Sequence, residues 1–263
     1  MSNESYPLFV EERRRVILEQ LRQHGRVFVK DLSDTMHVSA VTIRQDLRAL
    51  EDDGLLERTY GGAVQRSSAG IYTPELSFDV RQNRSARAKE AIGAAAAARV
   101  REGDAIALDA STTAFALSPH LKKLSRLTIV TNSLIIAQSF LDTPNVQVLM
   151  PGGRLRRDSI SLVGKPDFLP EINLNIGFFG TRGISLAGGV TDSDPDEVAM
   201  KAAMVRHCLQ AVVVADGSKW GQIAPYTFAR PQEVALVITS ADAPPEPVDE
   251  MAAAGVQVER VGV

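Results

Sequence analysis

The sequence predicts an α/β protein in which a small, mostly helical N-terminal domain precedes a larger domain built on a mainly parallel sheet. Short apolar, β-branched runs recur along the second part of the chain, at 105–109, 127–131, 146–150, 176–180, 211–216 and 234–239. Helical stretches lie between most of them, and buried strands that alternate with helices are typical of βαβ units. Before residue 67, apolar residues recur at helical spacing instead. We therefore divide the chain into a small domain, a linker and a large domain, at 1–66, 67–84 and 85–263.

The composition excludes several classes of protein. The chain has 263 residues, of which 44% are hydrophobic and 23% charged, and these values fit a globular protein rather than a disordered or fibrous one. Its single cysteine, Cys208, cannot form a disulfide within the chain, and its four histidines are dispersed, so we expect no metal site and no cofactor. No apolar run approaches the roughly 18–20 residues of a membrane helix, and residues 1–12 lack the basic start of a signal peptide. We expect a cytoplasmic protein without a membrane partner.

The small domain is predicted to contain three helices and a β-hairpin. Gly25 ends the first helix, and a short second helix is followed by a tight turn. Ser39 is then a suitable N-cap for a third helix, because its hydroxyl can accept a hydrogen bond from an unpaired backbone N–H. That helix stops at Gly54, and 55–64 is predicted to form a small β-wing.

The third helix has two faces of different chemistry. On a helical wheel, Ile43, Leu47 and Leu50 form the core-facing stripe, and polar side chains cover the opposite side. Arginine can pair with guanine, glutamine with adenine, and valine can contact a thymine methyl group. Two helices joined by a short turn, the second carrying such residues, are typical of a helix-turn-helix that reads DNA. The candidate DNA-binding residues are Ser39, Val41, Thr42, Arg44, Gln45 and Arg48, with Arg58 and Tyr60 on the wing.

The charge of the small domain leaves another interpretation open. Residues 1–66 carry ten Lys or Arg and eleven Asp or Glu, a net charge of −1, so its bulk charge does not indicate nucleic acid. Charged residues on the outer face of a helix are usually solvated. A solvated face, or a surface that binds protein, explains the same residues.

Polar residues follow the predicted strands of the large domain. The segments 109–113 (Asp-Ala-Ser-Thr-Thr) and 131–133 (Thr-Asn-Ser) each join a strand to a helix. Ligands gather at the carboxyl ends of parallel strands, where helix N-termini offer N–H groups to phosphate. Arg154 and Lys219 follow two further strands and supply positive charge. Ordinary helix capping explains the hydroxyls equally well, and the i,i+4 spacing of Glu197 and Lys201 is also that of a plain surface ion pair.

The small domain carries a long signature of fixed spacing. It consists of the run 38–47 (Val-Ser-Ala-Val-Thr-Ile-Arg-Gln-Asp-Leu), Leu50, Gly54, Leu56, Arg58 and the run 60–63 (Tyr-Gly-Gly-Ala). These residues resemble the N-terminal signature of DeoR-type transcriptional regulators, and the resemblance implies double-stranded operator DNA as a partner. Gln45 and Tyr60 stand where the family usually has Arg and His.

A second set of residues is spread over 74–240. It comprises 109–113, 131–133, 152–154, Gly164, 180–183, Glu197, Lys201 and 216–219. This set resembles the C-terminal sensor of the same regulators, which is similar in fold to ribose-5-phosphate isomerase and responds to phosphorylated sugars or related metabolites. Ser111 stands where the family commonly has glycine, and its Cβ is expected to narrow the phosphate pocket. The resemblance implies effector-binding roles for Asp109, Ser111, Thr112, Thr113, Asn132, Ser133, Arg154, Arg182, Glu197, Lys201 and Lys219.

The likeness to an isomerase raises the question of catalysis. An isomerase needs a general base and acids at a strand end, but the loop 180–183 holds Thr181 and Arg182 where the isomerases carry several acids. Arginine is a very poor proton acceptor because its pKa exceeds ~12. We therefore expect that the chain is not an enzyme. We expect a transcriptional regulator of sugar or carbohydrate metabolism genes, specifically a repressor, whose activity is controlled by a phosphorylated sugar bound in the C-terminal domain.

Assembly and the alternatives complete the sequence-based prediction. A single reading head buries too little surface for tight operator binding, so we expect a homodimer or a higher homo-oligomer. One alternative is an isomerase-like enzyme whose small domain only localises it. The other is a regulator whose large domain only oligomerises.

Overall fold

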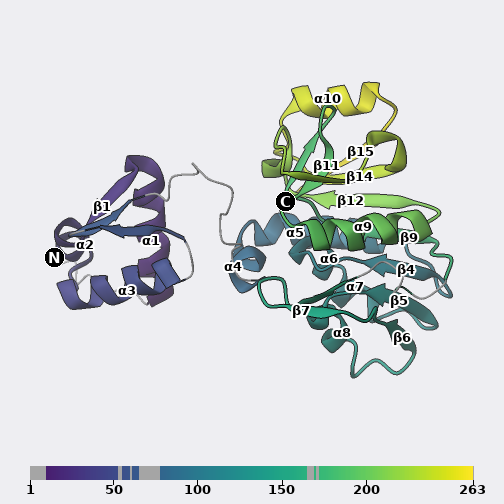
Figure 1. Ribbon diagram of the computed structural model, residues 1–263, viewed down its shortest axis with the longest axis horizontal. Helices are drawn as coiled ribbons and strands as arrows, with labels where there is room; N and C mark the ends of the chain where they lie inside the picture. The colour runs from purple at the N-terminus through teal and green to yellow at the C-terminus, as the bar shows by residue number, and fades with distance from the viewer. Residues whose placement is uncertain are drawn as a thin grey trace. The chain divides into compact units, whose positions relative to one another are not determined.

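The computed structural model describes residues 10–52, 55–59, 61–64, 78–164, 169 and 172–262. Residue contacts divide the chain into two compact units, Met1–Ser77 and Phe78–Val263 (Figure 1). Most of the predicted linker, 67–77, lies outside the described residues. Its last part, Phe78–Asn83, forms helix α4 of the second unit.

The first unit is a winged helix-turn-helix, as the sequence predicted. Its elements are α1 (Val10–His24), β1 (Arg26–Phe28), α2 (Val29–Met36), α3 (Ala40–Asp52), β2 (Glu57–Thr59) and β3 (Gly62–Val64). The three strands form an antiparallel sheet in the order β1-β3-β2, in which β1 was not expected. The side chains of Ile17, Leu32, Ile43 and Leu47 are 0–1% exposed and lie in its core. The predicted helix stop at Gly54 lies outside the described residues.

The turn between α2 and α3 sets the start of the third helix. His37 adopts a left-handed backbone conformation, with φ 52°, and ends α2. The Ser33 hydroxyl donates a hydrogen bond of 2.6 Å to the Val38 carbonyl and closes the turn. Because two local hydrogen-bonding groups hold this turn, the beginning of α3 is defined before the core packs.

The second unit contains a parallel sheet of seven strands, which confirms the predicted fold class. Its order is β15-β14-β12-β9-β4-β5-β6, and every neighbouring pair is parallel. The strands are β4 (Ala105–Leu108), β5 (Leu127–Thr131), β6 (Val146–Leu149), β9 (Ile176–Phe179), β12 (Ala211–Ala215), β14 (Leu236–Ser240) and β15 (Gln257–Val261). Six of them coincide with the apolar runs of the sequence, and β15 is an addition.

Helices cover both faces of this sheet (Figure 1). Alternate residues of one strand belong to different cores: Phe179 packs in one apolar cluster and Phe178 in the other, as expected for a strand buried on both sides. The first cluster includes residues of α9 (Pro195–His207) and α10 (Pro245–Ala253). The second includes residues of α5 (Ala86–Ala97), α6 (Thr112–Phe115), α7 (Ser118–Leu121) and α8 (Leu134–Ser139).

Two antiparallel insertions extend the second unit. One is the hairpin of β7 (Arg154–Arg156) and β8 (Ser161–Val163). The other is a three-stranded sheet of β10 (Gly183–Ser185), β11 (Gly189–Asp192) and β13 (Tyr226–Ala229). Both follow the ends of parallel strands, so they add polar residues to the edge where ligands gather in such sheets. Among the described helices, none is both long and apolar enough to span a bilayer.

We predict that Gly93→Ala destabilises the second unit. A Cβ at Gly93 of α5 would lie 2.5 Å from the carbonyl oxygen of Ala116, just after α6, so the two helices would have to separate. Overpacking of this kind costs about 1–3 kcal/mol, although alanine is otherwise the better helix former. The measurement is the free energy of unfolding in urea. Ala94→Ser, at an exposed position of the same helix, is the control, and equal stability of both variants would contradict the close contact.

Candidate functional site

The predicted DNA-reading residues are exposed on the outer face of α3. Val41 is 61% exposed, and the side chains of Arg44, Gln45 and Arg48 are exposed as well. The Ser39 hydroxyl accepts a hydrogen bond of 3.1 Å from the Thr42 backbone N–H and caps the helix, as predicted. The arrangement offers a row of hydrogen-bonding side chains around one apolar contact, which suits the edges of base pairs in the major groove.

One acidic residue of α3 points inward and was missed by the sequence analysis. Asp46 is 3% exposed and forms ion pairs with Arg13 at 2.6 Å and with Arg14 at 3.4 Å, both from α1. The ion pairs join α3 to α1 within the core of the small domain.

The predicted wing residues are only partly described. Arg58 on β2 is exposed, its backbone N–H donates to the Glu51 carboxylate at 3.0 Å, and its guanidinium lies 3.6 Å from the same carboxylate. An exposed ion pair of this kind is worth little, so Arg58 is available to a stronger anion. Tyr60 lies outside the described residues.

In the second unit, the centre of the strand-end site is the buried ammonium of Lys201. Its Nζ lies 2.9 Å from Asp109 Oδ2, 2.6 Å from Asp192 Oδ2 and 2.9 Å from the Gly180 carbonyl oxygen. Burial opposes the charge, but the two carboxylates outweigh it and raise the pKa of Lys201 above its ordinary value. The ammonium donates hydrogen bonds to Asp192 and to the Gly180 carbonyl and forms an ion pair with Asp109. Lys201 therefore joins four elements of the fold rather than offering a free cation.

Asp109 organises the loop that follows β4. One carboxylate oxygen accepts the Ser111 backbone N–H at 3.1 Å, and the other accepts the Gly180 N–H at 3.0 Å. The Ser111 hydroxyl accepts the Ala114 N–H at 3.0 Å and caps α6. A Cβ at Gly180 would lie 2.3 Å from the Ser111 Cβ, so the Ser111 side chain fills the space beside Gly180. The Ser111 hydroxyl is thus engaged in capping α6.

In the loop after β5, one hydroxyl caps a helix, and one buried amide oxygen has no hydrogen-bond partner among the described residues. The Ser133 hydroxyl accepts the Ile136 N–H at 3.2 Å and caps α8. The Asn132 amide donates to the Leu162 carbonyl at 3.2 Å. Its carboxamide oxygen is buried and, among the described residues, has no hydrogen-bond partner. A buried acceptor of this kind is costly unless a donor meets it, which marks Asn132 as a place for a ligand hydroxyl.

Glu197 and Arg154 lie in different environments. Glu197 is 5% exposed, and its carboxylate accepts the Ser161 hydroxyl at 3.1 Å and pairs with Arg156 at 3.0 Å. Because Lys201 is buried as well, the interpretation of these two residues as a plain surface pair was wrong. The Arg154 side chain is 67% exposed and pairs with Asp196 at 2.7 Å. Arg156, which the sequence analysis did not select, is the arginine that reaches the buried carboxylate.

Two lysines of this unit have a lowered pKa. Burial lowers the pKa of Lys89 to about 8, the carboxylate of Asp216 opposes the shift, and the positive charges of Lys219 and neighbouring arginines add to it. Burial also lowers the pKa of Lys219, where Asp216 again opposes the shift and neighbouring arginines add to it. Arg182 contributes to the field at Lys219. Lys89 was missed, yet the sequence carries a signal, because it precedes Ile92, Gly93 and Ala96 on the buried stripe of α5.

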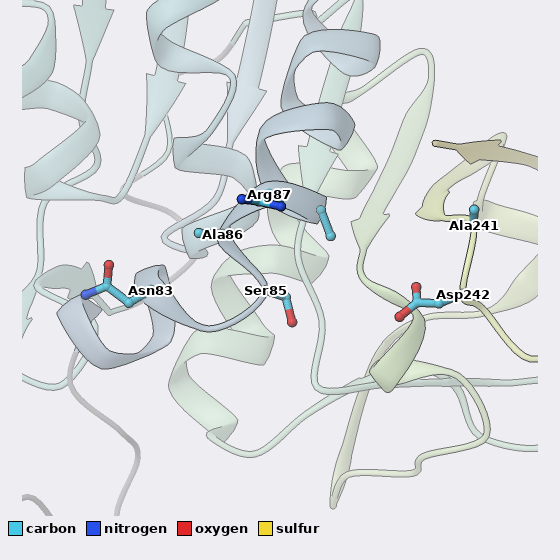
Figure 2. A pocket seen from close by; sticks show the side chains of 7 residues that line it. Asn83, Ser85, Ala86, Arg87, Ala241 and Asp242 are labelled. Carbon is cyan, nitrogen blue, oxygen red and sulfur yellow. The ribbon is translucent and has the colours of Figure 1, made fainter. Parts of the chain in front are cut away.

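A depression of about 730 Å³ opens next to these elements. It is lined by Asn83, Ser85, Ala86, Arg87, Ala88, Ala241 and Asp242. Figure 2 shows Ser85 on the turn before α5 and Asp242 after β14 approaching it from opposite sides. None of the predicted effector residues is among those that line it.

We predict that Asp192→Asn lowers the free energy of unfolding of the second unit, and that the size of this loss depends on pH. Burial works against the Asp192 charge, but Lys201 outweighs it and holds the pKa of Asp192 below 3.8 in the folded protein. The resulting stability is present above the ordinary pKa and is lost as the pH falls through the folded pKa. Loss of one partner from a buried pair costs about 3–5 kcal/mol at pH 7, and the difference from the natural protein shrinks below pH 4.

Thermal unfolding across this pH range measures the effect. Asp142→Asn serves as a control, because Asp142 pairs with Lys122 at the surface and its loss should leave the transition unchanged. A difference that stays constant down to pH 2 would mean that folding does not lower the pKa of Asp192.

Comparisons with known proteins bear on both units. The DeoR-like helix-turn-helix domain matches residues 13–69, and the DeoR C terminal sensor domain matches residues 84–241. The HTH-type transcriptional regulator GolR of Listeria innocua is 33% identical, over 88% of this chain and 91% of its own. The HTH-type transcriptional regulator GlpR of Haloferax volcanii is 35% identical, over 94% of this chain and 96% of its own.

Two further comparisons concern another relative and a solved structure. The glycerol-3-phosphate regulon repressor of Escherichia coli is 32% identical, over 91% of this chain and 93% of its own. Among solved structures, ribose 5-phosphate isomerase A from Methanocaldococcus jannaschii matches with a TM-score of 0.38 and 15% identity, covering 50% of this chain and 53% of that one. On the two matched domains and the full-length relatives, the chain belongs to the DeoR family of helix-turn-helix transcriptional regulators.

Proposed function

We propose that the chain is a repressor of carbohydrate-metabolism genes, which binds operator DNA through α3 and is controlled by a phosphorylated sugar in the sensor domain. The observation that carries the proposal is the contrast between the two faces of α3. Ile43 and Leu47 are buried, while Arg44, Gln45 and Arg48 are exposed. Relatives of this chain are named as repressors of the aga operon and of the glycerol-3-phosphate regulon, which supports the class of gene.

The DNA-binding role requires more than one copy. A single small module buries about 600–1,000 Å² on DNA, at the low end of what specific complexes use. A homodimer places two α3 helices on repeated half-sites and so doubles the protein surface that is buried on the DNA. We assign self-association to the sensor domain, because it is the larger of the two units.

The effector role rests on the strand-end site. Lys89 and Lys219 are both partly or wholly removed from water, and a phosphate placed between them would neutralise charge that burial otherwise penalises. Thr112 and Thr113, at the start of α6, carry two further hydroxyls at the end of β4. The unpartnered carboxamide oxygen of Asn132 suits a sugar hydroxyl. A phosphate group and a polyol are the two parts of a phosphorylated sugar.

Sensing accounts for the polar residues better than catalysis does. The carboxylates of Asp109 and Asp192 both hold Lys201, and Glu197 is paired with Arg156. A general base has to take up a proton at working pH, and Lys201 outweighs the effect of burial and holds the pKa of Asp192 below its ordinary value. The same contacts therefore favour a rigid binding site.

A titration of the purified protein onto a labelled fragment from upstream of its own gene tests the proposal. Fluorescence anisotropy is recorded at a stated salt concentration, with and without a panel of sugar phosphates. Competitor-resistant binding that one sugar phosphate changes by about 5–150-fold, the range of typical allosteric coupling, supports both roles. Binding that no compound changes favours a sensor domain that only oligomerises. Isomerisation of any compound in the panel would favour the enzyme.

We predict that Arg44→Ala removes specific operator binding and leaves effector binding unchanged. Loss of a bidentate contact to a base costs about 1–3 kcal/mol per copy, and a dimer loses it twice. The operator dissociation constant and, separately, the effector affinity are measured. Arg206→Ala, which removes an exposed arginine from α9 in the other unit, is the charge-matched control. Unchanged operator affinity in Arg44→Ala would exclude α3 as the reading helix.

We predict that Thr112→Val combined with Lys219→Ala abolishes the response to the effector while operator binding persists. The double change removes a hydroxyl and a cation from the proposed phosphate site but leaves the buried contacts of Lys201 intact. The ratio of operator affinities with and without effector should fall to one. Lys123→Ala, at an exposed position, should keep the full response. An intact response in the double variant would place the effector elsewhere.

A further inference from the structure

Helix α4 occupies a particular place in the sensor domain. It is the first described element after residues 65–77, the segment that connects the sensor domain to the DNA-binding domain along the chain. It is also short, running only from Phe78 to Asn83. A helix of six residues is unstable by itself, so its side-chain attachments to the rest of the domain decide whether it is folded.

The first residue of α4 is attached to the helix that begins at the proposed phosphate site. Phe78 is 2% exposed, and its ring meets the ring of Phe115 edge to face, with 5.6 Å between centroids. Phe115 is the last residue of α6, whose first residues are Thr112 and Thr113. Because α6 has a single turn, a shift of its start is felt directly at Phe115.

The last turn of α4 is attached to Lys89. The ammonium donates to the carbonyl oxygen of Arg81 and, at 2.7 Å, to that of Arg84. Directly after Arg84, Ser85 adopts a left-handed backbone with φ 54°, a conformation that is unfavourable for residues other than glycine. The two hydrogen bonds from Lys89 therefore hold a turn that would not persist by itself.

A third contact joins α4 to the β7–β8 hairpin. The Arg81 guanidinium lies 5.8 Å from the Phe78 ring centroid and donates to the Asp158 carbonyl at 3.4 Å. The same hairpin carries Arg156, which pairs with the buried Glu197. All three attachments of α4 thus lead to elements that bear candidate effector residues.

We propose that α4 is the relay through which the effector site acts on the DNA-binding domain, and that Phe78 and Lys89 hold it in position. This rests on the proposed function. Two of the three N–H donors of Lys89 go to the carbonyls of α4 and its turn, so the ammonium can hold α4 and an anion together. An anion beside Lys89 stabilises its charged form, in which the ammonium donates to both carbonyls, and so tightens α4 on the sensor domain. The chain that leads to the DNA-binding domain then starts from a more rigid point.

Amide hydrogen exchange on the full-length protein, with inorganic phosphate as the probe, tests the relay. Phosphate binding is measured in parallel by calorimetry, and chloride at equal ionic strength is the reference. Exchange within 79–84 should slow several-fold when phosphate binds, whereas exchange within β15 should stay the same. In Lys89→Gln, which keeps a donor but loses the charge, phosphate should not slow exchange in α4. Lys122→Gln, at an exposed lysine, is the matched control and should behave like the natural protein.

A second variant separates the relay from the anion site. Phe78→Ala should bind phosphate with unchanged affinity. Its amides within 79–84 should exchange several-fold faster than those of the natural protein, and phosphate should not slow them. Phe78→Leu should restore part of the slowing by phosphate. Phosphate binding without any slowing in α4 of the natural protein overturns the relay and leaves the proposed effector site standing. Absence of phosphate binding overturns the effector site and the relay with it. Slowing that persists in Lys89→Gln or Phe78→Ala overturns the roles of these residues.

Discussion

The sensor domain depends on one buried cation. Lys201 of α9 holds the carboxylates of Asp109 and Asp192 and the carbonyl of Gly180, and so joins the ends of β4, β9 and β11. Removing such ions from water costs several kcal/mol per ion, which only close ion pairs and further hydrogen bonds offset. Asp109 contributes to this offset, because it also accepts two backbone N–H groups. The convergence of these strand ends, on which any ligand site at this edge relies, is therefore set by electrostatics as much as by packing.

The same interaction decides which cations remain for a ligand. A lysine whose ammonium is held by two carboxylates and a carbonyl is a poor phosphate ligand, since an incoming anion would have to displace a carboxylate. Lys89 and Lys219 are in the opposite situation, because burial destabilises their charge and lowers the pKa of both. The domain thus contains one set of charges that is compensated within the fold and another set that gains from an external anion.

How far the sequence could predict this structure follows from the range of the interactions involved. The face of α3 and six strands of the parallel sheet were predictable because helical periodicity and runs of apolar residues are local signals. β1, β10 and β11 have only three or four residues each, too short to show a period, and their pairing depends on distant partners. The hydroxyls of Ser111 and Ser133 illustrate the limit within the site. Their position at strand ends was predictable, but both proved to cap helices, and capping and ligand binding demand the same residue type at the same place.

The contacts of the two domains also restrict how regulation can work. The DNA-binding domain fixes α3 through a buried apolar stripe and the pair of Asp46 with Arg13, so reshaping the reading helix would expose several buried apolar side chains at about 1.5–3 kcal/mol each. Typical allosteric coupling amounts to only ~1–3 kcal/mol. An aromatic pair contributes about 0.5–1.5 kcal/mol and a hydrogen bond from a charged donor about 1.5–3 kcal/mol. Attachments of the kind that hold α4 are therefore of the right size to be shifted by an effector, whereas the core beneath α3 is too strong. Regulation by placement of an intact reading head, rather than by its deformation, is the option that these magnitudes favour.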